Sequence, residues 1–329
     1  MYTDRIGVRG VPLRVSGSGT TVTHSTAIGS YDSVTLASSV FTCTPHYAFR
    51  IPPFLFGQAG TTSAGGVVTF SNVNVDSFKA NSLSGAGAAA DNTINVLPFG
   101  FGTVLTDSYS LINMVSMDFP CYLECFKIQG TGTAALSNNA TRAVLTDNGT
   151  GDYTVTLREG LSNSLPLVFG TAVGNTSATL NVHSIGPTSV QVKTYDAADA
   201  PVDADFYLFL FCPSSSYLHG NNRAPLQCTQ RNARFHLIQI DVTAGTPVLT
   251  YAPFGTSIVD TGIGIYTITF ATPFKREPYV LVGNQRANIS DPSATSIVVR
   301  AFTAAGALAD PSTPIYLLVY GFDDANEYW

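Results

Sequence analysis

The chain has 329 residues, of which 45% are hydrophobic and only 12% are charged, and its formal net charge is −6. No stretch of the sequence is rich in Lys or Arg, which argues against direct nucleic-acid binding, because such proteins need clustered basic groups to displace counterions. No apolar run approaches the roughly 18 residues of a membrane-spanning helix, so we expect no membrane span.

The N-terminal third, residues 1–120, carries no copy of the repeated motif described below. It contains Gly-, Ser- and Thr-rich segments that favour strands, such as GTTVTHSTA and GGVVTFSNVNV, and an Ala- and Gly-rich loop at 82–93. We predict a separate β-rich domain or an extended arm that attaches the protein to a larger assembly. The first fifteen residues lack the apolar centre of a signal peptide, so we expect the chain to stay in the cytoplasm where it is made or to leave by a route other than secretion.

Two stretches further along the chain repeat each other. NGTGDYTVTLREGLSNSLPLVFG (148–170) aligns without a gap with TGIGIYTITFATPFKREPYVLVG (261–283), which places Tyr153 on Tyr266. Two later pairs of segments repeat in the same order: 188–203 with 295–310, and 205–212 with 314–321. Three pairs of segments in one order indicate an internal duplication, with about ninety residues in each copy, a normal size for a small domain.

Each copy has the pattern of short strands. In YTVTL, Tyr153, Val155 and Leu157 alternate with threonines, which is the pattern of a half-buried strand, and the glycines before it favour a turn. Short strands between turn signals predict a β-sandwich or jelly roll. We therefore predict an all-β protein with a β-rich domain or arm (1–120), a first sandwich (121–212), a linker (213–233), and a second sandwich with an acidic tail (234–329).

The last strand of each copy is apolar on both of its faces, at Phe206–Phe211 and Ile315–Tyr320. One face fills the sandwich, and the other must be covered by a neighbouring domain, a long loop or another subunit. Because an uncovered apolar stripe promotes association, we predict a homo-oligomer. The predicted contact residues are Tyr207, Phe209, Phe211, Tyr316, Leu318, Tyr320 and Trp329; Trp329 is either an anchor in a partner pocket or part of a frayed tail.

The sequence shows no assembled set of catalytic or metal-binding residues. The histidines are scattered and form no metal motif, and Cys121-x-x-x-Cys125 lacks a second pair of ligands, so we interpret the cysteines as buried apolar residues. Asp196, Asp199, Asp203 and Asp205 form an acidic loop that could hold Ca²⁺, but we favour a solvated turn. We therefore expect a protein that is not an enzyme and has no cofactor.

The motif G-x-G-x-Y-T-[VI]-T-[LF], followed by a proline-bearing segment and an apolar strand that ends in glycine, resembles repeat domains of bacteriophage virion proteins, including tail-fibre and head-decoration proteins. The resemblance covers residues 121–322 and is strongest over 149–170 and 262–283. It implies a non-enzymatic structural component of the virion, assembled in the host cytoplasm, whose partners are further copies of itself and other virion proteins.

Two other functions compete with this interpretation. One is a carbohydrate-binding module that recognises host glycans through exposed aromatic residues such as Tyr251, Phe254 and Tyr279. The other is a glycan depolymerase, which often needs two carboxylates about 5–10 Å apart in a groove.

Overall fold

The computed structural model describes residues 6–10, 13–18, 20–24, 31–46, 48–49, 52–60, 66–91, 93–103, 115–117, 121–137, 143–158, 167–174, 176–186, 188–213, 224–228, 233–243, 245–283 and 286–322. Every regular element within these ranges is a β-strand. This confirms the predicted all-β class, with antiparallel sheets stacked in the manner of β-sandwiches.

Most strands belong to three units that have the same topology. The first unit contains β2 (Leu13–Ser18), β3 (Thr21–His24), β4 (Tyr31–Ala37), β5 (Val40–Pro45), β6 (Phe54–Ala59), β7 (Val67–Ser71), β8 (Phe78–Leu83) and β9 (Ile94–Thr103). The second contains β11 (Cys121–Gln129), β12 (Ala135–Leu136), β13 (Ala143–Gly149), β14 (Asp152–Leu157), β15 (Leu167–Val173), β16 (Thr179–Ile185), β17 (Ser189–Tyr195) and β18 (Asp205–Pro213). The third contains β20 (Ala233–Thr243), β21 (Thr246–Tyr251), β22 (Ser257–Gly262), β23 (Ile265–Thr269), β24 (Tyr279–Gly283), β25 (Ala287–Ser290), β26 (Ser296–Ala301) and β27 (Ile315–Phe322).

Each unit consists of two sheets, which we call inner and outer. The outer sheets have the orders β4-β5-β8-β7, β13-β14-β17-β16 and β22-β23-β26-β25. The inner sheets have the orders β3-β2-β9-β6, β12-β11-β18-β15 and β21-β20-β27-β24. The first strand of a unit therefore pairs with the last, as expected for a sandwich that winds from both chain ends.

The N-terminal third thus repeats the topology of the two copies that the sequence revealed. Its relation to them shows at the tight turn before β5, β14 and β23, where the residue that immediately precedes the strand has a positive φ: Ser39 (61°), Gly151 (65°) and Gly264 (67°). Each of these residues accepts a backbone hydrogen bond at its carbonyl from the neighbouring strand. The residue types differ and the geometry is retained, so the sequence comparison missed the first unit.

Three further strands join the inner sheets of the first and second units: β1 (Ile6–Gly10), β10 (Val115–Met117) and β19 (Ala224–Cys228). β1 pairs with β9 and β10, and β19 pairs with β10 and β11. Because β19 lies within residues 213–233, part of the predicted linker is a sheet strand.

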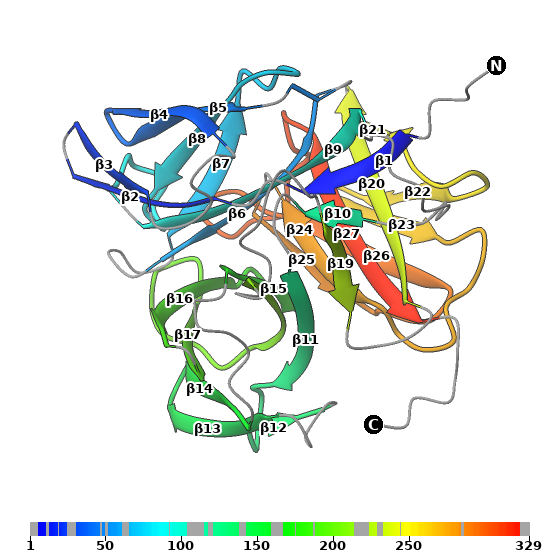
Figure 1. Ribbon diagram of the computed structural model, residues 1–329. Coiled ribbons are helices and arrows are strands. Elements are labelled where there is room, and N and C mark those ends of the chain that lie inside the picture. The colour runs from blue at the N-terminus through cyan, green and yellow to red at the C-terminus, as the bar shows by residue number, and fades with distance from the viewer. Residues whose placement is uncertain are drawn as a thin grey trace.

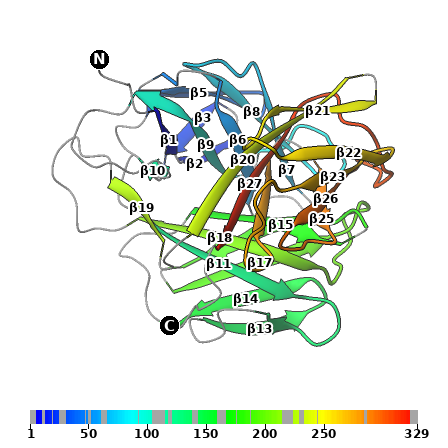
Figure 2. The same cartoon turned by 90° about the vertical axis from the view of Figure 1, so that its right-hand side faces the viewer.

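The three units lie around a common centre, with their inner sheets facing it (Figure 1). The view turned by 90° shows the same three sandwiches, in blue to cyan, green, and yellow to red (Figure 2). At the centre β6, β15 and β24, the equivalent strands of the three units, contact one another. Parallel bridges join the end of the central strand of one unit to the next unit: Gly60, which follows β6, pairs with Val182 of β16, and Val173 of β15 pairs with Ile289 of β25. The chain therefore has an approximate threefold arrangement within a single polypeptide.

The buried hydrophobic residues form two separate clusters. The second unit has a sandwich core of its own, built from buried residues such as Tyr153, Val155, Phe206, Leu208 and Leu210. A second, larger cluster unites the cores of the first and third units with the shared centre. Burial of large side chains stabilises by about 1.5–3 kcal/mol each, so the contact between units is a major part of the folded state.

Candidate functional site

The second unit's predicted contact residues lie inside the chain. They are Tyr207, Phe209 and Phe211, and each is at most 1% exposed. The ring of Tyr279, in the third unit, lies edge-on to Tyr207 at 5.8 Å and to Phe209 at 6.4 Å between centroids. Phe211 lies 6.3 Å from Phe99 of the first unit. This face of β18 is therefore covered by both other units.

The corresponding residues of the third unit are buried in the same way. They are Tyr316, Leu318 and Tyr320, and none is more than 6% exposed. Tyr316 meets Phe54 of the first unit edge-on at 5.6 Å, and Tyr320 stacks on Tyr279 at 6.0 Å.

These six side chains are thus not an oligomer surface, and that prediction was wrong. The requirement that both faces of the last strands be covered was correct, but the cover is supplied by the neighbouring units of the same chain. The seventh predicted contact residue, Trp329, lies outside the described residues. Homo-oligomerisation stays a prediction that now needs a different surface.

An ion pair joins the second and third units next to these buried aromatic residues. Lys127 Nζ lies 2.7 Å from Glu277 Oε1 and 2.8 Å from Oε2. The Tyr207 hydroxyl donates a hydrogen bond to the same carboxylate. Burial, together with the charge of Glu277, raises the pKa of Tyr207 above its usual range, so this phenol remains a donor at all physiological pH values.

A carboxylate fixes the turn before β14 in the second unit. Asp203 Oδ1 accepts hydrogen bonds from the Gly151 amide at 2.7 Å and from the Tyr153 hydroxyl at 2.9 Å. Asp205 Oδ1 accepts from the amides of Gly130 (2.9 Å) and Thr131 (3.0 Å). These two candidate calcium ligands therefore organise backbone turns, and no group of three or more acidic, His or Cys side chains is close enough to hold a metal among the described residues.

The same carboxylate contact recurs in the third unit and, in altered form, in the first. Asp310 Oδ1 accepts from the Gly264 amide and the Tyr266 hydroxyl, both at 2.8 Å. In the first unit Asp91 Oδ1 instead accepts from the Ser39 hydroxyl at 2.7 Å. Phe41 stands there in place of the tyrosine, so Ser39 supplies the hydroxyl from the turn itself.

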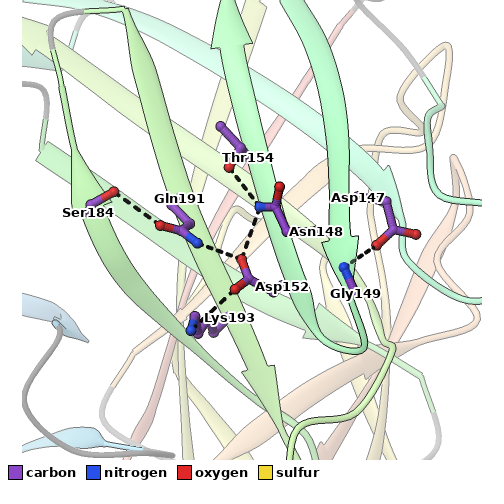
Figure 3. A network of polar contacts seen from close by, with 8 residues as sticks. All are labelled: Asp147, Asn148, Gly149, Asp152, Thr154, Ser184, Gln191 and Lys193. Carbon is purple, nitrogen blue, oxygen red and sulfur yellow. Dashed lines mark hydrogen bonds and ion pairs between the residues drawn. The ribbon is translucent and has the colours of Figure 1, made fainter.

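The outer sheet of the second unit carries a connected polar network on its solvent face (Figure 3). Asp152 Oδ1 accepts from Gln191 Nε2 at 2.7 Å and from Asn148 Nδ2 at 3.1 Å, and Lys193 Nζ lies 3.2 Å from Oδ2. Asn148 also donates to the Thr154 hydroxyl at 2.9 Å. Partial burial acts to raise the pKa of Asp152, but the hydrogen bonds and Lys193 outweigh it and lower the pKa.

The other outer sheets do not reproduce this network. The position of Asp152 is taken by Val40 in the first unit and by Ile265 in the third, as the strand registers show. The third unit instead exposes apolar side chains: Val259 is 55% exposed and Ile263 is 69% exposed. The threefold arrangement of the backbone therefore presents three chemically different outer faces.

The aromatic residues considered for glycan binding have three different environments. Tyr279 is buried at the shared centre, which removes it from any surface site. Tyr251 is partly buried and lies edge-on to Phe54 at 5.1 Å. Only Phe254 is fully exposed among the three.

Sequence reasoning missed the polar side chains that join the first unit to the second. Asn95 Nδ2 donates to the carbonyl of Val168 at 2.9 Å. Gln58 Oε1 accepts from the Gly170 amide at 3.0 Å, and its Nε2 donates to the carbonyl of Leu180. The sole sequence signal was an amide side chain inside an apolar strand, FLFGQA or INVLPF, and that signal does not identify the partner.

Comparison of the chain with protein-family models, with curated proteins and with solved structures gave no match. Among the described residues there is no helix with the length and apolar character needed to cross a membrane.

Proposed function

We propose that this protein is a non-enzymatic structural component of a bacteriophage particle. The G-x-G-x-Y-T motif and its resemblance to phage virion domains motivate the proposal. The observation that carries it is the packing of three sandwiches of one topology around a shared buried centre. Such a chain is a preassembled block that offers three outer faces for contact, which suits several weak contacts acting together.

Between a tail-fibre protein and a capsid decoration protein, the geometry favours decoration. A fibre subunit would need its apolar inner sheets to pack against other copies, whereas here Phe209, Leu318 and their neighbours are covered within one chain. One copy is therefore already complete around its approximate threefold axis. Such a block can occupy a position of local threefold symmetry on a shell as a single chain, with each of its three chemically different outer faces making its own contacts.

The test is to locate the protein in purified particles of the virus that encodes it. Mass spectrometry of the particles detects the chain, and gold-labelled antibody raised against the recombinant protein shows its position by electron microscopy. We expect label on the head. Label on the tail would transfer the protein to the tail-fibre class, and its absence from purified particles would refute a virion role.

A glycan-binding role is the second candidate, and the full exposure of Phe254 supports it, because an exposed aromatic ring can stack on a sugar face. A glycan array with the wild-type protein and Phe254→Ala tests it. Binding that is lost in the variant supports the role. No binding by the wild type contradicts it.

A further inference from the structure

The first strand of a unit pairs with the last strand of that unit along one edge, and in two units its other edge receives an added strand. In the first unit β1 and β2 together form this first strand, because both pair with β9. β10 lies parallel to β1 at Val8–Gly10, and β19 lies parallel to β11 at Cys121–Leu123. In both units the added strand therefore lies beside the first half of the first strand.

The third unit has the same first strand without the added one. On the edge of β20 away from β27, β21 pairs with the second half, Gln239–Thr243. No described strand pairs with Phe235–Leu237 on that edge. The registers make these residues equivalent to Val8–Gly10, because Val8, Leu123 and Phe235 each pair with the residue two before the end of the last strand: Phe101, Phe211 and Tyr320.

The burial of equivalent side chains reflects this difference. Leu123, in the strand that β19 flanks, is 1% exposed. Phe235 is only partly buried, although its ring packs against Tyr320 with 4.8 Å between centroids. A strand added beside β20 would therefore cover an aromatic side chain as well as pair with backbone groups.

This edge of β20 lacks the features that normally prevent pairing with another strand, which are proline, a bulge or a projecting charge. Phe235–Leu237 contains no proline, and its pairing with β27 has no register shift. The neighbouring Arg234 donates to the carbonyls of Thr272 and Pro273, so its charge is held against that loop. The edge is therefore suited to strand addition.

We propose that the edge of β20 at Phe235–Leu237 binds an extended, uncharged segment of a partner protein, which adds as a parallel strand to the inner sheet of the third unit. The strands on the equivalent edges, VSM in β10 and APLQC in β19, define the chemistry, since both are uncharged and have apolar side chains at alternate positions. In strand addition, main-chain hydrogen bonds supply affinity and alternate side chains supply specificity.

A second copy of β20 does not fit this edge equally well. An isologous contact is related by a twofold axis, and it would pair the two copies of β20 antiparallel, whereas both occupied edges hold a parallel strand. The inference rests on strand pairing alone, so it holds whether or not the protein belongs to a virus particle.

The probe is a blocked peptide with the sequence of residues 112–118, which includes β10. Hydrogen exchange of the full chain is followed by mass spectrometry with and without this peptide. We expect exchange at 235–237 to be faster than at 121–123 in the protein alone. At a peptide concentration about nine times the dissociation constant, exchange at 235–237 should slow about tenfold, as linked binding requires. The same peptide N-methylated at Ser116 and Met117 should give no protection, because it lacks backbone donors.

Three results would overturn the proposal. Absence of protection by the peptide would mean that the edge does not accept a strand. Slow exchange at 235–237 in the protein alone, independent of its concentration, would mean that the chain covers this edge itself. Slow exchange that appears only at high protein concentration would assign the edge to a second copy.

A variant of the edge locates the bound peptide. Phe235→Ala removes the side chain that the added strand covers, and we expect it to raise the dissociation constant of the peptide about three- to tenfold. Val144→Ala, at an exposed apolar residue on the outer sheet of the second unit, is the matched control and should bind as the wild type does. An unchanged affinity in Phe235→Ala would place the peptide elsewhere. If this variant fails to fold, protection of the wild type by the N-methylated peptide would still contradict strand addition.

Discussion

Replacing Asp310 by Ala should destabilise the third unit by removing one oxygen that satisfies two donors. Asp310 Oδ1 accepts from the Gly264 amide and the Tyr266 hydroxyl at 2.8 Å each, and Tyr266 is fully buried. Hydrogen bonds to charged groups contribute about 1.5–3 kcal/mol each, which gives about 3–6 kcal/mol for two. Because Asp310 itself is exposed, water partly replaces the carboxylate, and we expect about 3 kcal/mol, the lower end of that range.

Two matched variants separate this mechanism from a general effect of mutation at the turn. Asp310→Asn keeps an oxygen acceptor and should cost about 1 kcal/mol. Tyr266→Phe removes one donor and leaves the amide contact, so it should also cost about 1 kcal/mol; Phe41 is the natural residue at the equivalent place in the first unit. Urea denaturation followed by near-ultraviolet circular dichroism gives the free energies. If Asp310→Ala costs no more than Tyr266→Phe, the reasoning fails.

Three further variants test the packing of the units. Phe209→Ala leaves a cavity between the second and third units and should cost about 3–5 kcal/mol in the same denaturation assay; a cost below 1 kcal/mol would mean that the inner sheets do not pack as described. Glu277→Gln should cost about 1–2 kcal/mol, with the loss shrinking in a Lys127→Met background if the two residues act as a pair. Burial, with Arg234 nearby, lowers the pKa of His236 from 6.5 to about 4. Between these pH values the unfolded chain binds a proton at His236 that the folded chain does not, so the free energy of unfolding of the wild type should fall by up to about 3 kcal/mol from pH 6.5 to pH 4. His236→Phe should flatten that part of the pH–stability profile. An unchanged pH dependence in the variant would exclude His236 as its source.

The local features of the fold could be predicted because strands follow from short-range patterns. The alternation in YTVTL and YTITF marks one face as buried, and Tyr153 and Tyr266 are both fully buried. The two apolar faces of the last strands also required cover on both sides, and both faces are covered. In contrast, which part of the protein covers these apolar faces depends on contacts between residues that are far apart in sequence, such as Phe99 with Phe211.

The first unit escaped detection as a repeat for a physical reason that its turn illustrates. The turn before β5, β14 and β23 requires a residue with positive φ and a hydroxyl group that donates a hydrogen bond to an aspartate. In the second and third units a glycine has the positive φ and a tyrosine supplies the hydroxyl. In the first unit Ser39 meets both needs alone, at φ 61°. Different residues satisfy the same geometry, so a comparison of residue types does not recognise it.

The amino-acid sequence by itself determined that this is an all-β chain of short strands with apolar surfaces on both faces of its last strands, because alternation and turn chemistry act over a few residues. Only the tertiary structure decided that these surfaces close on one another around a threefold-like centre. That outcome depends on whether the chain can bring three sheets together at once, and the free energy of burial is the same whether the covering sheet comes from the same chain or from another.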